Sequence, residues 1–171
     1  MDQSRELFRH TLIYGLIIGG VMSLYQFLLF VFGMTNNNTM ASLVPFFEIL
    51  GLLISIKQFR DIVQDGTITF GRAFTVGIYT SFFAGIVSVS YEYFFYAYLS
   101  PGSFVEMVGQ LKELIAKSSP PPDQLRFWHQ FFIWLNPASA TILSILGVIL
   151  YGSFFSLLMA FMLRKEIRRI G

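Results

Sequence analysis

Four long apolar blocks constrain this sequence more than any other feature. They occupy residues 11–32, 41–56, 73–99 and 138–163. A bilayer core of about 30 Å is crossed by about 20 apolar residues in a helix that rises about 1.5 Å per residue. The expected fold is therefore all-α, a polytopic membrane helix bundle of four transmembrane helices. We expect it to form a single membrane domain over residues 1–171.

The composition agrees with a membrane protein. Hydrophobic residues make up 54% of the chain and charged residues 13%, whereas a soluble domain carries about 25% charged residues. The sequence has no cysteine, which excludes disulfides, a thiolate nucleophile and a thiolate metal site. The small net charge of +2 does not favour nucleic acid as a partner, because the basic residues lie at the expected membrane edges.

Two of the four blocks have alternative interpretations. Arg5 and Arg9 precede the first block as in a signal peptide, but the run is long and 32–36 offers no small-x-small cleavage site, so we expect a retained span. The second block, 41–56, is near the short limit and contains Pro45. It is the weakest of the four spans, and a tilted or re-entrant segment is the alternative.

The distribution of basic residues predicts the orientation. Nine of the twelve Lys and Arg fall on one side of the four spans: Arg5, Arg9, Lys57, Arg60, Arg72, Arg164, Lys165, Arg168 and Arg169. The positive-inside rule then places both termini in the cytoplasm. We expect a multi-pass protein of the cytoplasmic (inner) membrane.

The segment 100–137, between spans three and four, is expected to form amphipathic helices on the outer side. Ser103 and Glu106 have capping-box spacing, and apolar residues follow at helical intervals. Three prolines at 120–122 end this helix, and a second, aromatic-rich helix is expected after Asp123. We favour anchoring in the membrane interface, with a docking surface for an outer partner as the alternative.

Two acidic residues inside the apolar blocks are the candidate functional residues. Glu48 falls near the middle of the second block, where a charge is costly and is a functional candidate by default. It would bind a cation, relay a proton or meet a cationic group; the alternative, which we favour, is a protonated carboxyl hydrogen-bonded inside the bundle. Glu92, near the outer end of the third block, is a weaker candidate.

No catalytic or metal-binding pattern is recognisable. The two histidines, His10 and His129, fall at opposite membrane surfaces and cannot share a metal or complete a Ser/His/Asp set. The sequence therefore predicts no catalytic residues, no metal and no cofactor, and a protein that is not an enzyme.

Small residues at helical spacing predict close helix packing. Gly15 and Gly19 form a G-x-x-x-G pair in the first span. Two further stripes occur in spans three and four: Ala73, Gly77, Ser81 and Gly85, then Ala140, Ser144, Gly152, Ser156 and Ala160. Such stripes let helix backbones approach where lipid gives no hydrophobic drive. We favour packing within the chain, with oligomerisation as the alternative.

The stretch Lys57-Gln58-Phe59-Arg60-Asp61, followed by Gly66-Thr67-Ile68-Thr69-Phe70-Gly71-Arg72-Ala73-Phe74, resembles an uncharacterised bacterial membrane family. This family is a domain of unknown function with four predicted helices. The resemblance implies a four-helix membrane fold and no particular activity. It also draws attention to the loop between spans two and three, where Gly66 would make the turn and Thr69 would cap the third span.

These observations leave two hypotheses for function. The first is a non-enzymatic structural, anchoring or regulatory component of a membrane assembly. Its partners would be the lipid bilayer and a second copy of the chain or another membrane protein. The alternative is a small transporter or channel subunit that uses Glu48 and requires oligomerisation, because four spans alone rarely enclose a path.

Overall fold

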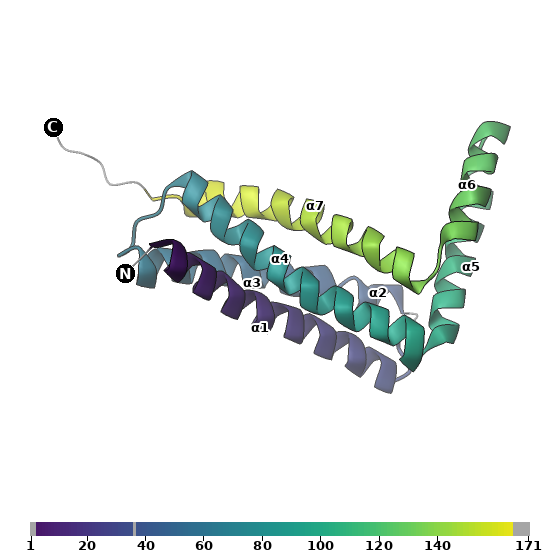
Figure 1. Cartoon of the computed structure of the whole chain (residues 1–171), viewed down its shortest axis with the longest axis horizontal. Coiled ribbons are helices and arrows are strands. Elements are labelled where there is room, and N and C mark those ends of the chain that lie inside the picture. Colours follow the sequence, from purple (N-terminus) through teal and green to yellow (C-terminus); the bar gives the residue numbers. More distant parts are fainter. Residues whose placement is uncertain (1–2, 36, 166–171) are drawn as a thin grey trace. The chain divides into compact units, whose positions relative to one another are not determined.

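The computed structural model describes residues 3–35 and 37–165, and these residues are almost entirely helical (Figure 1). The elements are α1 Gln3–Val31, α2 Asn38–Ala41, α3 Val44–Gln58, the π-helical turn η1 Phe59–Val63, α4 Phe70–Phe94, the π-helical turn η2 Phe95–Leu99, α5 Pro101–Lys117, α6 Pro122–Trp134 and α7 Pro137–Leu163. No strand occurs within these two ranges, apart from a single antiparallel bridge between Ile68 and Lys165. The predicted all-α class is confirmed.

Four stretches in the described ranges are long and apolar enough to cross a membrane: Gln3–Val31, Thr39–Val63, Phe70–Leu99 and Pro137–Leu163. The prediction of four spans is confirmed at this level. The second span is longer than the sequence indicated, because helical structure continues past Lys57 and Arg60 to Val63. Long basic side chains allow such an extension, since the charged head reaches water while the stem lies along apolar surface.

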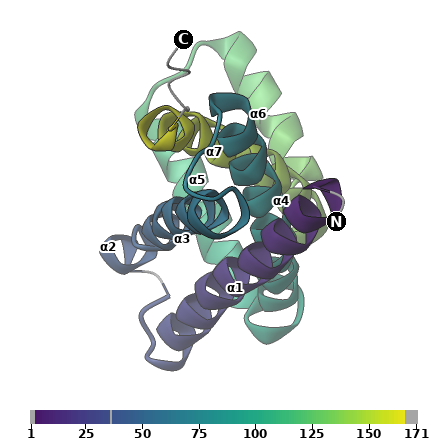
Figure 2. The same ribbon diagram turned by 90° about the vertical axis from the view of Figure 1, so that its left-hand side faces the viewer.

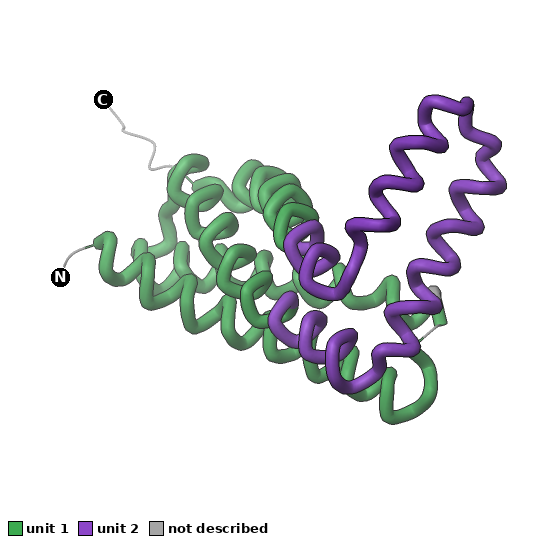
Figure 3. Tube along the Cα trace, turned by 45° about the vertical axis from the view of Figure 1, so that its right-hand side comes forward, with its two compact units in different colours: residues 1–88, 145–171 green, residues 89–144 purple. Residues whose placement is uncertain are grey.

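The described chain divides into two compact units (Figure 3). Unit 1 comprises residues 1–88 and 145–171, and unit 2 comprises residues 89–144. The boundaries fall inside α4 and α7, so each of these helices contributes one part to each unit.

Unit 1 is a bundle of α1, α3 and the unit 1 parts of α4 and α7 (Figures 1 and 2). Its main apolar cluster lies where α1 begins and α3 continues into η1: Leu7, Ile56, Phe59, Ile68, Ala73, Val76 and Ala160. A second cluster joins Ile18 and Met22 of α1 to Ala84 of α4. The remaining faces expose large apolar side chains, as expected for helices that contact lipid.

Unit 2 contains the predicted pair of helices between spans three and four. α5 packs through Phe104 against Tyr96 of η2, with ring centroids 5.6 Å apart. α6 has no buried residue and carries a run of aromatic side chains, in which Trp128 packs edge-on against Phe131 and at a tilt against Phe132. Two helices occur here, as predicted. The prediction that Ser103 and Glu106 form a capping box is wrong. α5 begins at Pro101 after Ser100, so Ser103 lies inside the helix, where its hydroxyl pairs with that of Ser100 at 2.9 Å.

Candidate functional site around Glu48

Glu48 is buried inside unit 1 by the first turns of α3. Pro45 lies in the first turn of this helix, where an amide proton would have no intrahelical acceptor. The next turn points Glu48 inward, and only 3% of the residue is exposed. Its neighbours Val44 and Phe47 pack on the apolar cluster of Ile18 and Met22. The first turns of α3 therefore pack on α1, and the Glu48 side chain lies in the interior of the bundle.

Two other helices meet at this carboxyl group. A Cβ atom built at Gly152 of α7 would lie 3.2 Å from Glu48 Oε1 and would collide with the side chain of Ser81 from α4. Gly152 thus lets α7 approach both polar side chains. Glu48 Oε1 and Ser81 Oγ are both buried, and neither has a hydrogen-bond partner among the described residues. A buried polar atom without a partner costs about 1–3 kcal/mol.

Ser81 also lines a cavity of about 190 Å³ between α4 and α7. Its other lining residues are Ile78, Tyr79, Phe82, Ile149 and Ser153. Its lining is mostly apolar, and apolar cavities of this kind stay dry. Ser81 therefore lies both in the wall of this cavity and beside Glu48 and Gly152.

A second polar group lies in unit 1 and was not predicted. The Ser55 and Thr80 hydroxyls are 3.0 Å apart, and His10 Nε2 lies 3.0 Å from the Ser55 carbonyl oxygen. His10 also stacks on Tyr14, with centroids 4.3 Å apart. The only sequence signal was the spacing of Glu48 and Ser55, which lie two helical turns apart on one face of α3. Serine and threonine are common in spans, so this pairing could be recognised only after the helices were placed.

Glu92, the second candidate, lies in unit 2 and has a different environment. Its Oε1 accepts a hydrogen bond of 3.0 Å from Ser144 Oγ. Ser144 was predicted only as a small packing residue. A satisfied carboxyl group of this kind is typical of an interhelical hydrogen bond that holds two helices together.

The glycines singled out in the sequence lie at close approaches within unit 1. A side chain at Gly15 would collide with Phe83, and one at Gly19 would lie 2.6 Å from the Ala84 carbonyl oxygen. Gly77 lies against Ser156, and Gly85 against Val148. These positions allow α4 to approach α1 on one side and α7 on the other.

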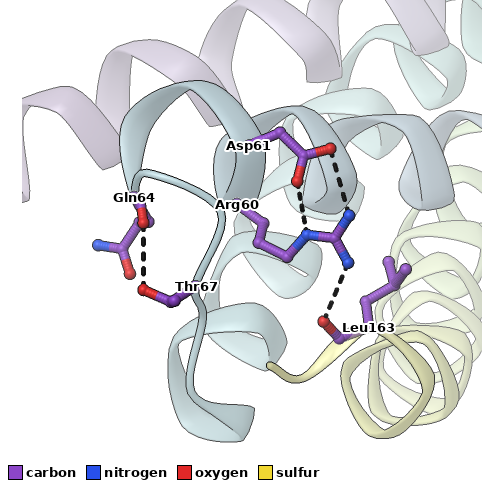
Figure 4. Close-up of polar contacts among 5 residues, drawn as sticks. All are labelled: Arg60, Asp61, Gln64, Thr67 and Leu163. Carbon is purple, nitrogen blue, oxygen red and sulfur yellow. Dashed lines mark hydrogen bonds and ion pairs between the residues drawn. The ribbon is translucent and has the colours of Figure 1, made fainter. Parts of the chain in front are cut away.

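The loop between spans two and three forms an ordered hairpin in unit 1 (Figure 4). Arg60 Nε and Nη2 donate to the Asp61 carboxylate at 2.7 and 3.2 Å, while Nη1 lies 3.4 Å from the Leu163 carbonyl oxygen at the end of α7. Gly66 makes the turn with φ +82°, as the sequence indicated. Thr69 Oγ1 accepts a hydrogen bond of 3.4 Å from the Arg72 amide, which is the expected cap of α4. Arg60 thus ties the hairpin to the end of the last span.

Comparison with protein families matches residues 13–165 to a family of proteins of unknown function, DUF4199. The chain belongs to this family. The match covers the first span from residue 13 onward, the other three spans and the hairpin, so the resemblance seen in the sequence is confirmed at the level of the family. Neither the comparison with curated proteins nor that with solved structures found a match. Membership of DUF4199 assigns no activity.

Proposed function

We propose that this DUF4199 protein is a non-enzymatic component of an assembly in the bacterial inner membrane, where it acts by anchoring or regulating a partner. The observation that carries this proposal is α6. None of its residues is buried, yet it exposes Leu125, Phe127, Ile133 and Trp134. An apolar face outside the spans is stabilised when a membrane interface or a protein covers it.

Photo-crosslinking at α6 tests this proposal. A benzophenone side chain at Phe127 or Ile133 should give a protein adduct of defined mass in native membranes, and the same group at the exposed Gln110 of α5 serves as the control. Adducts to lipid alone from Phe127 and Ile133, with no protein partner after mild extraction, would leave α6 as an interfacial anchor and contradict the assembly role.

The proposed orientation places both termini in the cytoplasm. It is supported by the nine-to-three distribution of basic residues and the positive-inside rule. Because the natural chain has no cysteine, single cysteines at Gln64 and Gln124 report the two sides directly. A membrane-impermeant maleimide applied to intact spheroplasts should label Gln124→Cys and leave Gln64→Cys unlabelled. The reverse pattern would invert the topology.

A second candidate function is favoured by Glu48 Oε1, which is buried without a hydrogen-bond partner among the described residues. Glu48 Oε1 and Ser81 Oγ can act as ligands for a cation or as a proton acceptor and donor, because neither is engaged by another described residue. The test is cation and proton flux into liposomes containing the protein, its Glu48→Gln variant and its Glu92→Gln variant as the matched control. Loss of flux in Glu48→Gln alone supports the role, and equal flux in all three proteins excludes it.

A further inference from the structure

A hollow of about 760 Å³ opens in unit 1 where α1 begins and η1 ends. Its lining residues are Arg5, Glu6, Arg9, His10, Ile13, Ile62 and Val63. Figure 1 shows the start of α1 and the hairpin after α3 at the same end of this unit. The volume lies within the range of about 300–1,000 Å³ that is usual for small-molecule sites.

One wall of the hollow is a stripe along α1. Arg5, Arg9 and Ile13 follow one another at intervals of four residues, so they lie on one face of the helix, each about 6 Å beyond the last. The stripe changes from basic to apolar as α1 enters the span. Neither guanidinium forms an ion pair with any residue in the described ranges. The wall therefore offers positive charge at the end of the span and apolar surface below it.

The opposite wall is the π-helical turn η1. Ile62 is 72% exposed, and Val63 follows it at the end of the turn. The preceding Phe59 is fully buried and packs edge-on against His10 at 5.1 Å, which holds η1 against α1. π-helical turns are rare and occur frequently at functional sites.

We infer that this hollow binds an anionic phospholipid. Arg5 and Arg9 would contact the headgroup phosphate, and the part of the acyl chains next to the headgroup would lie beside Ile13, Ile62 and Val63. Guanidinium groups are well suited to phosphate because they donate several hydrogen bonds in a fixed plane. The apolar half favours a lipid over a free phosphate, which would leave Ile13 and Ile62 uncovered. Glu6 lies in the same wall and leaves a net charge of +1, which matches a phosphodiester.

Native mass spectrometry of the purified full chain tests the inference. Phosphatidylglycerol and phosphatidylcholine with identical acyl chains are titrated in parallel, and glycerol 3-phosphate is added as a competitor without acyl chains. We expect phosphatidylglycerol to bind more tightly. Each arginine removed should weaken its binding about fivefold, so Arg5→Gln/Arg9→Gln should lose about 25-fold. Removing two charges from the segment between spans three and four, Lys112→Gln/Arg126→Gln, is the matched control and should change binding less than about twofold.

Two further variants separate the site from a general effect of charge. Glu6→Gln should tighten phosphatidylglycerol binding about threefold, because it removes the acidic group from the wall. Ile62→Ser should weaken both lipids by a similar factor, because it alters only the apolar half. If the double arginine variant fails to fold, Glu6→Gln decides alone.

Several results would overturn the inference. These are equal binding of the two lipids, equal losses in the arginine variant and its control, or unchanged or weaker binding in Glu6→Gln. Displacement of the lipid by glycerol 3-phosphate at equal concentration would instead identify a site for a soluble phosphate, which also contradicts the lipid assignment.

Discussion

Glu48 and Glu92 are both acidic residues within apolar spans, but the two compact units treat them differently. In unit 2, Glu92 accepts a hydrogen bond from Ser144. In unit 1, Glu48 is 3% exposed and its Oε1 has no partner among the described residues, although Ser81 and Gly152 surround it. A hydrogen bond to a carboxyl oxygen holds helices together, whereas a buried carboxyl oxygen without a partner lowers stability. The contrast therefore makes Glu48 the stronger of the two functional candidates.

The largest expected effect comes from closing the space around Glu48. Gly152→Val would push a branched side chain into Ser81 and Glu48, and overpacking of this kind lowers the free energy of unfolding by about 2 kcal/mol. Gly147→Val is the matched control on the same helix, because a Cβ atom there meets nothing within 4 Å. Unfolding in mixed detergent micelles with increasing dodecyl sulfate, followed by circular dichroism, measures both variants. Equal losses in the two would show that α7 does not approach Glu48 as described.

The next effect has the opposite sign. Glu48→Leu removes a buried acceptor without a partner and keeps the side chain volume similar, so the free energy of unfolding should rise by about 1 kcal/mol. The same unfolding experiment measures it, with Glu92→Leu as the control that loses a hydrogen bond and should not gain stability. A loss of stability in Glu48→Leu would mean that the carboxyl group has a structural partner in the membrane, and the contrast between the two residues would fail.

The sequence predicts those features that depend on residues close together in the chain. The spans follow from the composition of each block, and the turn at Gly66 and the cap at Thr69 follow from residues next to one another. The end of α5 was also predictable, since three prolines follow it. Its start was not, because Pro101 fits the first helical turn and so moves the helix ahead of the apparent capping box.

The environment of Glu48 could be predicted only in part. Its burial follows from its place in an apolar block. Its contact with Ser81 and Gly152 depends on the register between three helices, and small residues at every fourth position allow more than one register. The same reason hides the pair formed by Ser55 and Thr80, as well as the hydrogen bond from Ser144 to Glu92. A sequence pattern identifies the faces that pack, but not which residues on those faces meet.

A smaller effect tests the satisfied carboxyl group directly. In a double-mutant cycle with Glu92→Gln and Ser144→Ala, we expect a coupling energy of about 0.6 kcal/mol, the average for hydrogen bonds between membrane helices. The parallel cycle with Glu48→Gln and Ser81→Ala should give a smaller coupling, because Glu48 Oε1 and Ser81 Oγ lie close together without the geometry of a full hydrogen bond. The free energies come from the same unfolding transitions. A larger coupling in the second cycle would reverse the assignment of the two residues.

The smallest expected change in the free energy of unfolding comes from a carboxyl group exposed to water, which serves as the reference for the two buried ones. Glu113 on α5 is exposed and pairs with Lys117, with Oε1 and Nζ 2.8 Å apart. Exposed pairs at this spacing contribute about 0.3 kcal/mol and weaken as salt is added. Glu113→Gln should therefore lower the free energy of unfolding by about that amount at low salt and by less at about 1 M salt. The coupling energy between Glu92 and Ser144 should not change with salt. The pair lies within the spans, and the serine hydroxyl carries no charge that ions could screen. If both respond to salt equally, then Glu92 is reached by ions, and its carboxyl group shares the wet environment of Glu113 rather than the interior of unit 2.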